Sequence, residues 1–235
     1  MIYIDNYDDE GSSDGWISWF CELEGHEFFA EVDEDYITDS FNLFGLKQVV
    51  QNYDEALNMI LSPETPESEQ LKDQSFLDLY QSAMDLYGLI HARFILSPKG
   101  LQMMREKYIK NIFGACPRIL CDRQLVLPVG MSEDLSISRV KVYCPKCKEV
   151  YVPRMKFVDI DGAYFGSSFP HIFLQTYPEY LPDNNPVMYV PRIYGFRLFG
   201  KKGSKYEGKY IGENNVIMDF NENISKKITG TLGGN

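Results

Sequence analysis

The sequence predicts an α+β fold in which an all-α N-terminal domain precedes a small antiparallel β domain and an extended C-terminal hairpin and tail. Apolar residues recur at three- and four-residue spacing through residues 16–110. Strand-forming runs, VKVYC and EVYVP, appear only after residue 111. Four of the five cysteines form C-x4-C and C-x2-C pairs, the pattern of a zinc ribbon. We expect a flexible acidic arm (1–15), a helical domain (16–110), a ribbon domain (111–170), a C-terminal segment (171–200) and a disordered tail (201–235).

The cysteine spacing predicts one closed, structural Zn²⁺ site. Cys116 and Cys121 form one knuckle, and Cys144 and Cys147 form the second. Four thiolates can surround Zn²⁺ tetrahedrally, and they leave no open position for the water of a catalytic zinc. Two disulfides or unligated core cysteines are the alternatives. Disulfides need a secretory signal and an oxidising compartment, and the N-terminal MIYIDNYDDE has neither a basic nor an apolar signal region.

Charge is distributed unevenly along the chain, which has a net charge of −11. Residues 1–110 hold 22 acids and 7 bases, whereas residues 111–200 hold 8 acids and 10 bases. An acidic front half repels nucleic acid and membrane surfaces and attracts polyamines or basic peptides, although a well-solvated acidic surface is the alternative. No apolar run reaches the roughly 18 residues of a membrane span. We expect a soluble, intracellular protein that binds neither nucleic acid nor membrane.

The helical domain begins at Trp16, where aromatic and aliphatic residues recur at helical spacing. His26 and Glu27 begin an HExxH-like run, but Ala30 stands where a zinc protease needs its second histidine, so we treat the match as coincidental. Acids at 33–35 predict the start of a second helix. Its buried stripe should hold Tyr36, Ile37, Phe41 and Leu43.

Three further helices are expected. One spans about 47–61 and ends at Pro63; the longest runs from Ser75 to Phe94; the last starts at Ser97-Pro98, a capping hydroxyl followed by proline. His91 on the longest helix is predicted to be a hydrogen-bonded core residue. The segment 62–73 between the first two is an exposed acidic loop. Its acids are Glu64, Glu67, Glu69 and Asp73.

The two strand runs after residue 111 should form a hairpin that carries the thiolates. Their apolar side chains exceed what one small hairpin can cover, which favours a symmetric homodimer. The candidates for its seam are Val140, Val142, Tyr143, Val150 and Val152. Residues 189–199 alternate bulky apolar residues with proline and glycine, which suits a hairpin placed on another surface; packing on the protein's own core is the alternative.

Several segments, in one order from residue 16 to residue 196, resemble the regulatory beta subunit of casein kinase II. They include WISWFC (16–21), YGLIHARFIL (87–96), CPR--C (116–121), YCPKC (143–147) and VPR-YGF (190–196). The resemblance implies a non-catalytic, cytoplasmic and nuclear protein that dimerises through its zinc ribbons and holds two kinase catalytic subunits in a heterotetramer. It also implies that residues 171–200 dock the catalytic subunit. The docking residues would be Pro191, Tyr194, Gly195, Phe196 and Phe199.

The chain departs from that family in its acidic regions. Ser12 and Ser13, followed by Asp14, loosely match an N-terminal phosphorylation cluster and are the candidate phosphoacceptors. The acidic loop is thinner, because Pro66 and Lys72 interrupt it. Polyamines or basic substrates remain its expected ligands.

Two other functions can be tested against the sequence. A kinase is excluded because the chain has no glycine-rich phosphate loop, V-A-I-K, H-R-D or D-F-G motif. A nucleic-acid-binding zinc ribbon of the transcription type stays open as the alternative, but residues 116–147 hold only five bases against three acids. A DNA-binding module should carry a distinct basic stripe.

Overall fold

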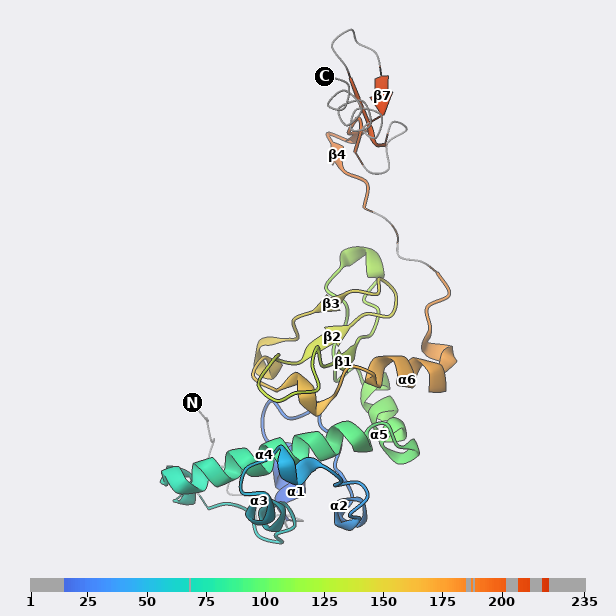
Figure 1. Ribbon diagram of the computed structural model, residues 1–235. Helices are drawn as coiled ribbons and strands as arrows, with labels where there is room; N and C mark the ends of the chain where they lie inside the picture. The colour runs from blue at the N-terminus through green and yellow to red at the C-terminus, as the bar shows by residue number, and fades with distance from the viewer. Residues whose placement is uncertain are drawn as a thin grey trace, which may run out of the picture. The chain divides into compact units, whose positions relative to one another are not determined.

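The chain divides at residue 184 into two units in the computed structural model, and each unit is described by itself. The structure describes residues 15–67, 69–184, 187, 189–201, 207–211 and 217–219. Most of the described helices precede the small antiparallel sheets in the sequence, which is compatible with the predicted α+β fold (Figure 1). Among the described helices, none combines the length and the apolar character needed to cross a bilayer.

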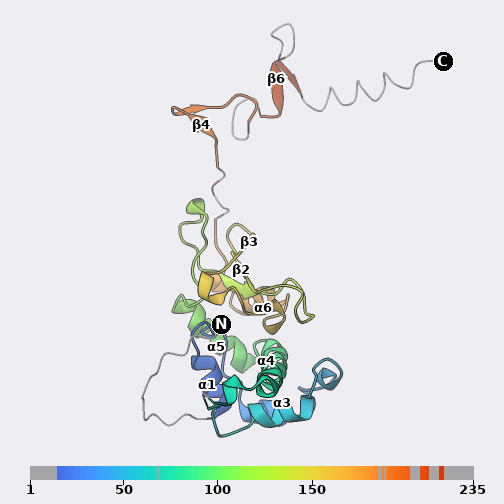
Figure 2. The same ribbon diagram turned by 90° about the vertical axis from the view of Figure 1, so that its left-hand side faces the viewer.

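The helical part of the first unit is arranged around α4 (Gln74–Phe94), with α1 (Trp16–Glu22) and α3 (Tyr53–Ile60) beside it in both ribbon views (Figures 1 and 2). The predicted starts of the two longest helices are confirmed. The Asp73 side chain accepts the Ser75 N–H at the start of α4. The Ser97 hydroxyl accepts the Gly100 N–H at the start of α5 (Pro98–Ile109). Shorter elements complete this part: α2 (Glu34–Thr38), η1 (Leu46–Gln48) and η2 (Gln70–Lys72).

Two helix predictions are wrong in detail. The stripe expected to continue to Leu43 stops at Thr38, because the Asp39 carboxylate accepts the Phe41 N–H at 2.9 Å and turns the chain. Phe41 is therefore 83% exposed instead of buried. The helix expected from residue 47 starts only at Tyr53, since Asn52 adopts a left-handed conformation with φ 48°.

The second part of the first unit is a three-stranded antiparallel sheet in the order β1 (Leu127–Val129), β2 (Lys141–Tyr143), β3 (Val150–Tyr151). The register places Val142 opposite Pro128 on one side and Tyr151 on the other. The expected hairpin between the two strand runs is thus confirmed. Helix α6 (Phe169–Thr176) contacts β1 and was not predicted. Short 3-10 turns link these elements: η3 (Ile119–Cys121), η4 (Met155–Phe157), η5 (Gly162–Tyr164) and η6 (Pro178–Tyr180).

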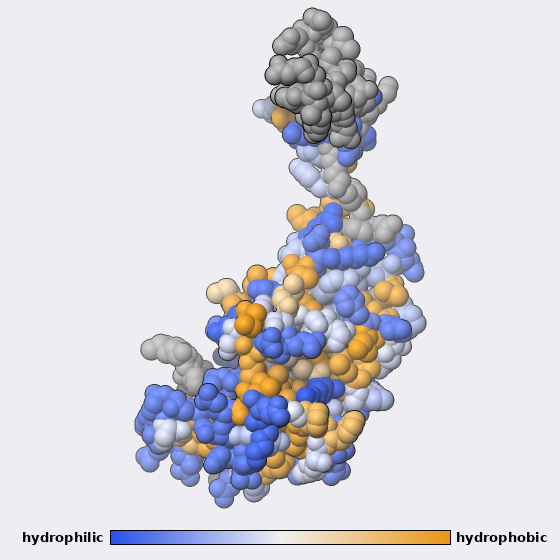
Figure 3. All heavy atoms as spheres, in the orientation of Figure 1, coloured by the Kyte–Doolittle hydropathy of each residue, from blue (hydrophilic) through white to orange (hydrophobic). Residues whose placement is uncertain are grey.

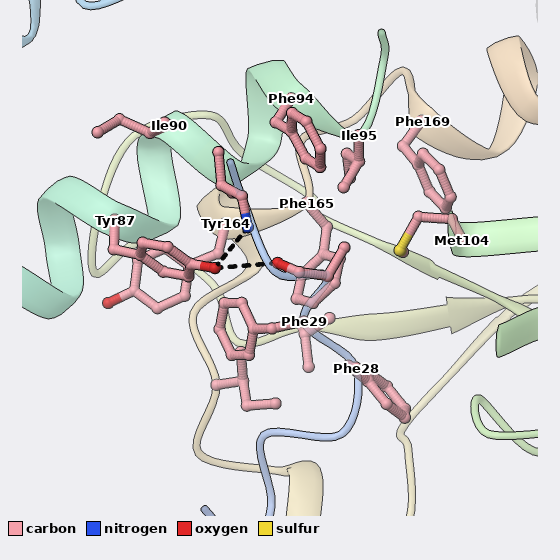
Figure 4. Close-up of a cluster of buried hydrophobic side chains, with 14 of the residues drawn as sticks. Phe28, Phe29, Tyr87, Ile90, Phe94, Ile95, Met104, Tyr164, Phe165 and Phe169 are labelled. Atoms are coloured by element: carbon pink, nitrogen blue, oxygen red, sulfur yellow. Dashed lines mark hydrogen bonds between the residues drawn. The ribbon is translucent and has the colours of Figure 1, made fainter. Parts of the chain in front are cut away.

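One aromatic core joins the helical part to the sheet, and the buried segment that carries Phe28 and Phe29 runs through it (Figure 4). Phe28 stacks on Phe157 with ring centroids 4.0 Å apart, and Phe29 lies 5.0 Å from the His91 ring. The Tyr87 hydroxyl donates to the Ala30 carbonyl at 3.0 Å and accepts the Val32 N–H at 3.2 Å (Figure 4). The HExxH-like run is therefore a turn, closed by the Phe29 N–H donating to the His26 carbonyl, that leads into the buried segment, and it is not a metal-binding helix.

Helix α4 approaches the sheet side closely at Gly88. A Cβ atom there would lie 2.0 Å from the Tyr164 ring of η5, so only glycine fits. This contact fixes the ribbon part against the longest helix.

The described residues of the second unit form two small antiparallel hairpins. Strand β4 (Arg192–Ile193) pairs with β5 (Phe196–Arg197), and β6 (Lys209–Ile211) pairs with β7 (Ile217–Asp219). The second hairpin lies within the segment that we expected to be a disordered tail.

Candidate metal centre

The structure brings the four predicted ligand cysteines together. Their Sγ atoms all lie within 4.8 Å of one another, and those of Cys116 and Cys147 are 3.9 Å apart. A tetrahedron with Zn–S bonds of about 2.3 Å has edges of about 3.8 Å, so the cluster has the size of a zinc-tetrathiolate site. No disulfide joins any of the five cysteines, and the disulfide alternative is not realised.

Each pair of cysteines sits in a tight turn that its own backbone hydrogen bonds close. In the first turn the Cys116 N–H donates to the Gln124 carbonyl at 2.8 Å, and Asp122 has φ 52°. In the second turn the Cys144 N–H donates to the Glu149 carbonyl at 3.0 Å, and Lys148 has φ 59°. A left-handed residue after each pair turns the chain back, so that both thiols of a turn point to one centre. The C-x4-C and C-x2-C spacings therefore encode similar turns.

Burial and local hydrogen bonds set the acidity of the thiols. Burial raises the pKa of Cys121 to about 11 and the pKa of Cys144 well above its usual value. Burial also raises the pKa of Cys147, but hydrogen bonds from the Tyr151 hydroxyl and the Glu149 N–H outweigh it and place that pKa at about 7. A divalent cation must therefore displace protons from most of these thiols when it binds.

Two side chains beside the cluster suit a negatively charged tetrathiolate. The Tyr151 hydroxyl lies 3.3 Å from the Cys147 sulfur, where it donates a hydrogen bond to a thiolate. Lys146, whose side chain is 15% exposed, is held by Asp122 at 2.8 Å and places a positive charge between the two turns. Cysteine spacing does not show that either residue lies beside the cluster. For Tyr151, the only signal in the sequence is its position on the strand after the second turn.

The fifth cysteine and the core histidine belong to the fold. Cys21 lies outside the cluster, 3.3 Å from the Tyr87 hydroxyl, and burial raises its pKa to about 12. His91 is fully buried and both its ring nitrogens are hydrogen-bonded, as predicted. Neither residue contributes to the metal centre.

The hairpin of β4 and β5 carries the candidate docking residues in the second unit. Tyr194 and Gly195 form its two-residue turn, both with positive φ (47° and 86°), which matches the twist of the paired strands. Residues two apart in a strand share one face, but Tyr194 is a turn residue and Phe196 lies on β5, so these two aromatics are not a same-face pair of one strand. Tyr194 is 96% and Phe196 79% exposed. Pro191 accepts the Leu198 N–H at 3.3 Å, and Phe199 is 40% exposed.

The acidic loop is exposed, and hydrophilic residues gather over the end of the first unit that holds α3 and the start of α4 (Figure 3). Glu64, Glu67 and Glu69 are exposed on it. Asp73 serves a structural role instead, because its carboxylate accepts the N–H and the hydroxyl of Ser75 at the start of α4. Ser12 and Ser13 lie outside the described residues.

The chain is thus an α+β protein of the class in which a helical part shares its hydrophobic core with a ribbon that carries a candidate four-cysteine metal centre. The family model of the casein kinase II regulatory subunit matches residues 15–197, so the chain belongs to this family. The chain is 52% identical over 186 residues to casein kinase II subunit beta of Dictyostelium discoideum. This alignment covers 78% of this chain and 68% of the relative.

Two further relatives agree. Casein kinase II subunit beta-3 of Arabidopsis thaliana is 50% identical over 190 residues, with 80% of this chain and 69% of the relative covered. Casein kinase II subunit beta of Schizosaccharomyces pombe is 48% identical over 197 residues, with 82% and 84% covered. The chain is thus a regulatory subunit of casein kinase II and not an enzyme, and the nucleic-acid-binding alternative finds no support.

Proposed function

We propose that this chain assembles a casein kinase II holoenzyme in the cytoplasm and nucleus, as a zinc-dependent homodimer that binds two catalytic subunits and modulates their activity and substrate choice. The observation that carries this proposal is the family match over residues 15–197, which includes all four clustered cysteines and the hairpin of β4 and β5. The chain contributes assembly and positioning, and the catalytic subunit contributes the phosphoryl-transfer chemistry.

The metal centre has a structural role in this proposal. The four clustered cysteines (Cys116, Cys121, Cys144 and Cys147) would hold one Zn²⁺ per chain. The donor set and the sulfur separations fit it, and four thiolates leave no position for a substrate. The bound ion would join η3 to the turn after β2, segments with few buried apolar residues of their own.

The ribbon is the proposed dimer interface. Val140 and Val142 are buried in the chain's own core, so they cannot form the seam that the sequence suggested. Val150 and Val152 are 40% and 62% exposed, and Met155 is 86% exposed. Val150 and Val152 follow the second cysteine turn in sequence, and an isologous contact with a second copy would bury these exposed apolar side chains.

Co-expression with a casein kinase II catalytic subunit tests the assembly. We expect one complex of two chains of each kind in size-exclusion chromatography with light scattering, and we expect it to contain zinc. Separate elution of the two proteins at micromolar concentration would contradict the proposal.

The acidic loop is the proposed site for polyamines or basic substrate segments. Glu64, Glu67 and Glu69 are exposed and close in sequence, but Lys72 and the proline-broken backbone keep the charge density low. Three exposed carboxylates in solvent give only weak, salt-screened attraction. The loop therefore needs additional charge to bind polycations at physiological ionic strength.

A further inference from the structure

The acidic loop between α3 and α4 contains two hydroxyl residues that each precede a proline, Ser62-Pro63 and Thr65-Pro66. Proline directly after the acceptor is the feature that proline-directed Ser/Thr protein kinases select. We propose that Thr65 is a phosphorylation site for a kinase of this class, and that its phosphate restores the charge of the acidic loop. The second half of this proposal rests on the proposed role of the loop as a polycation site.

The local structure presents Thr65 as an extended, accessible acceptor. Residues 61–67 contain neither helix nor strand, and Thr65 is partly exposed. Because Pro66 follows it, its backbone is restricted to extended conformations, the form in which a kinase binds a substrate segment. Hydrogen bonds hold the loop on both sides: Glu64 N–H to the Ser62 hydroxyl at 3.0 Å, and Glu67 N–H to Gln70 Oε1 at 2.9 Å.

Ser62 has the same following proline but a different environment. Its hydroxyl accepts the Glu64 N–H, and its carbonyl accepts the Trp16 N–H at 3.0 Å, which ties it to the start of α1. A kinase would have to pull this residue away from the core. By contrast, the Thr65 hydroxyl makes no hydrogen bond within the described part of the chain. Thr65 is therefore the acceptor, and Ser62 is its matched control.

Phosphorylation changes the electrostatics of the loop directly. The γ-phosphoryl group of ATP moves to Thr65 Oγ1: the bond from phosphorus to the ADP oxygen breaks, the new O–P bond forms, and the kinase's catalytic base takes the hydroxyl proton. The product carries about −1.5 to −2 charges at pH 7. Glu64 and Glu67 flank it in sequence, so all three groups lie within about one Debye length, roughly 8 Å, of a single bound polycation.

The modification is tested on the full-length, zinc-loaded protein with a purified mitogen-activated protein kinase and ATP. We expect one phosphate per chain, located at Thr65 by peptide mass spectrometry. Thr65→Ala should abolish the incorporation, and Ser62→Ala should leave it unchanged. No incorporation, or incorporation at Ser62 instead, would overturn the proposal.

Calorimetry with spermine at about 0.15 M salt tests the consequence. We expect the phosphorylated protein to bind spermine about tenfold more tightly than the unmodified protein. If the unmodified protein binds and the phosphate adds nothing, the regulatory inference fails while the loop's proposed function stands. If neither form binds, both fail. Binding by the phosphorylated form alone supports the inference and shows that the loop requires the modification.

Discussion

The imidazole of His91 has a single favourable tautomer in the folded protein. The Ala30 N–H donates to Nε2 at 3.0 Å, so the proton sits on Nδ1 and is donated to the Tyr164 carbonyl at 2.7 Å. A second proton would face the Ala30 N–H inside the aromatic core. Burial is the main cause that lowers the pKa of His91 to about 4; the positive charge of Lys107 acts in the same direction, and the hydrogen bond to the Tyr164 carbonyl opposes both.

This histidine should make stability depend on pH. The folded-state pKa lies below the unfolded value of about 6.5, so the stabilisation is fully present above about pH 6.5 and is lost as the pH falls through about 4. We expect the free energy of unfolding to fall by about 3 kcal/mol from this group between those limits. Urea titrations measure it. His91→Gln should be less stable at neutral pH, but its free energy of unfolding should change less steeply with pH. Equal pH dependence in the two proteins would contradict the assignment of this dependence to His91. Thiolate protonation affects both proteins and cancels in the comparison.

Cys144 is the candidate ligand whose loss should be most damaging, because it is fully buried. We expect Cys144→Ser to lose zinc, to expose the segment 111–170 to proteolysis and to aggregate, since the ribbon lacks an alternative staple. Metal analysis and thermal melting measure the effect. Cys21→Ser is the matched control: it should keep its zinc, because Cys21 lies outside the cluster. A zinc-loaded, normally melting Cys144→Ser protein would contradict the ligand assignment.

At the scale of secondary-structure elements, the sequence predicted the helices that are marked by apolar periodicity or by a side-chain cap. Helix α4 follows from its apolar spacing and α5 from Ser97-Pro98, and both are present. The four-cysteine cluster follows from cysteine spacing alone. The stop after α2 was missed because it depends on the Asp39 carboxylate capping the Phe41 N–H, an interaction that competes locally with helix formation.

Helix α6 was missed for a different reason. Its eight residues include only two phenylalanines and begin with Phe169-Pro170, a composition that also suits an irregular segment. The helix is stabilised by tertiary packing of Phe169 and Phe173, which are both fully buried. Tyr151 could not be assigned to the metal centre, because its contact with Cys147 depends on the register of β3.

The hairpin of β4 and β5 is the element with the sharpest functional prediction. Tyr194 at the turn and Phe196 on β5 are large aromatic side chains with exposed surface, of the kind that concentrates interface energy. We expect Tyr194→Ala/Phe196→Ala to reduce affinity for the catalytic subunit about a hundredfold or more, while the protein stays zinc-loaded and dimeric. Titration calorimetry with the purified catalytic subunit measures it.

A second exposed aromatic pair provides the control for that experiment. Phe41 and Phe44 are 83% and 82% exposed on the loop after α2. Phe41→Ala/Phe44→Ala removes the same kind of surface from the first unit and should leave the affinity unchanged. Equal binding by the hairpin double mutant and the wild type would assign residues 189–199 to packing within the chain.

At the scale of the whole molecule, the metal centre and the dimer should depend on each other. The exposed valines of the ribbon, Val150 and Val152, follow the second cysteine turn directly in sequence. We therefore expect the held thiolates of that turn to fix their orientation together with the pairing of β3 on β2. Loss of zinc should dissociate the dimer, whereas loss of the dimer surface should leave the zinc in place.

The ribbon surface can be tested separately from the metal with Val152→Asp/Met155→Asp. Each side chain is more than half exposed, at 62% and 86%, so the chain can fold with the charges in solvent. In an isologous contact each substitution occurs twice, and four buried carboxylates would oppose association. We expect light scattering to give twice the 27.1 kDa chain mass for the wild type and the single-chain mass for the variant, with zinc retained by both. A wild-type protein that is monomeric at micromolar concentration would show that there is no dimer. A variant that stays dimeric would show that the dimer contact lies elsewhere.

Cys144→Ser, by contrast, should lose the zinc and the dimer together, because an unfolded ribbon presents no fixed surface to a second copy.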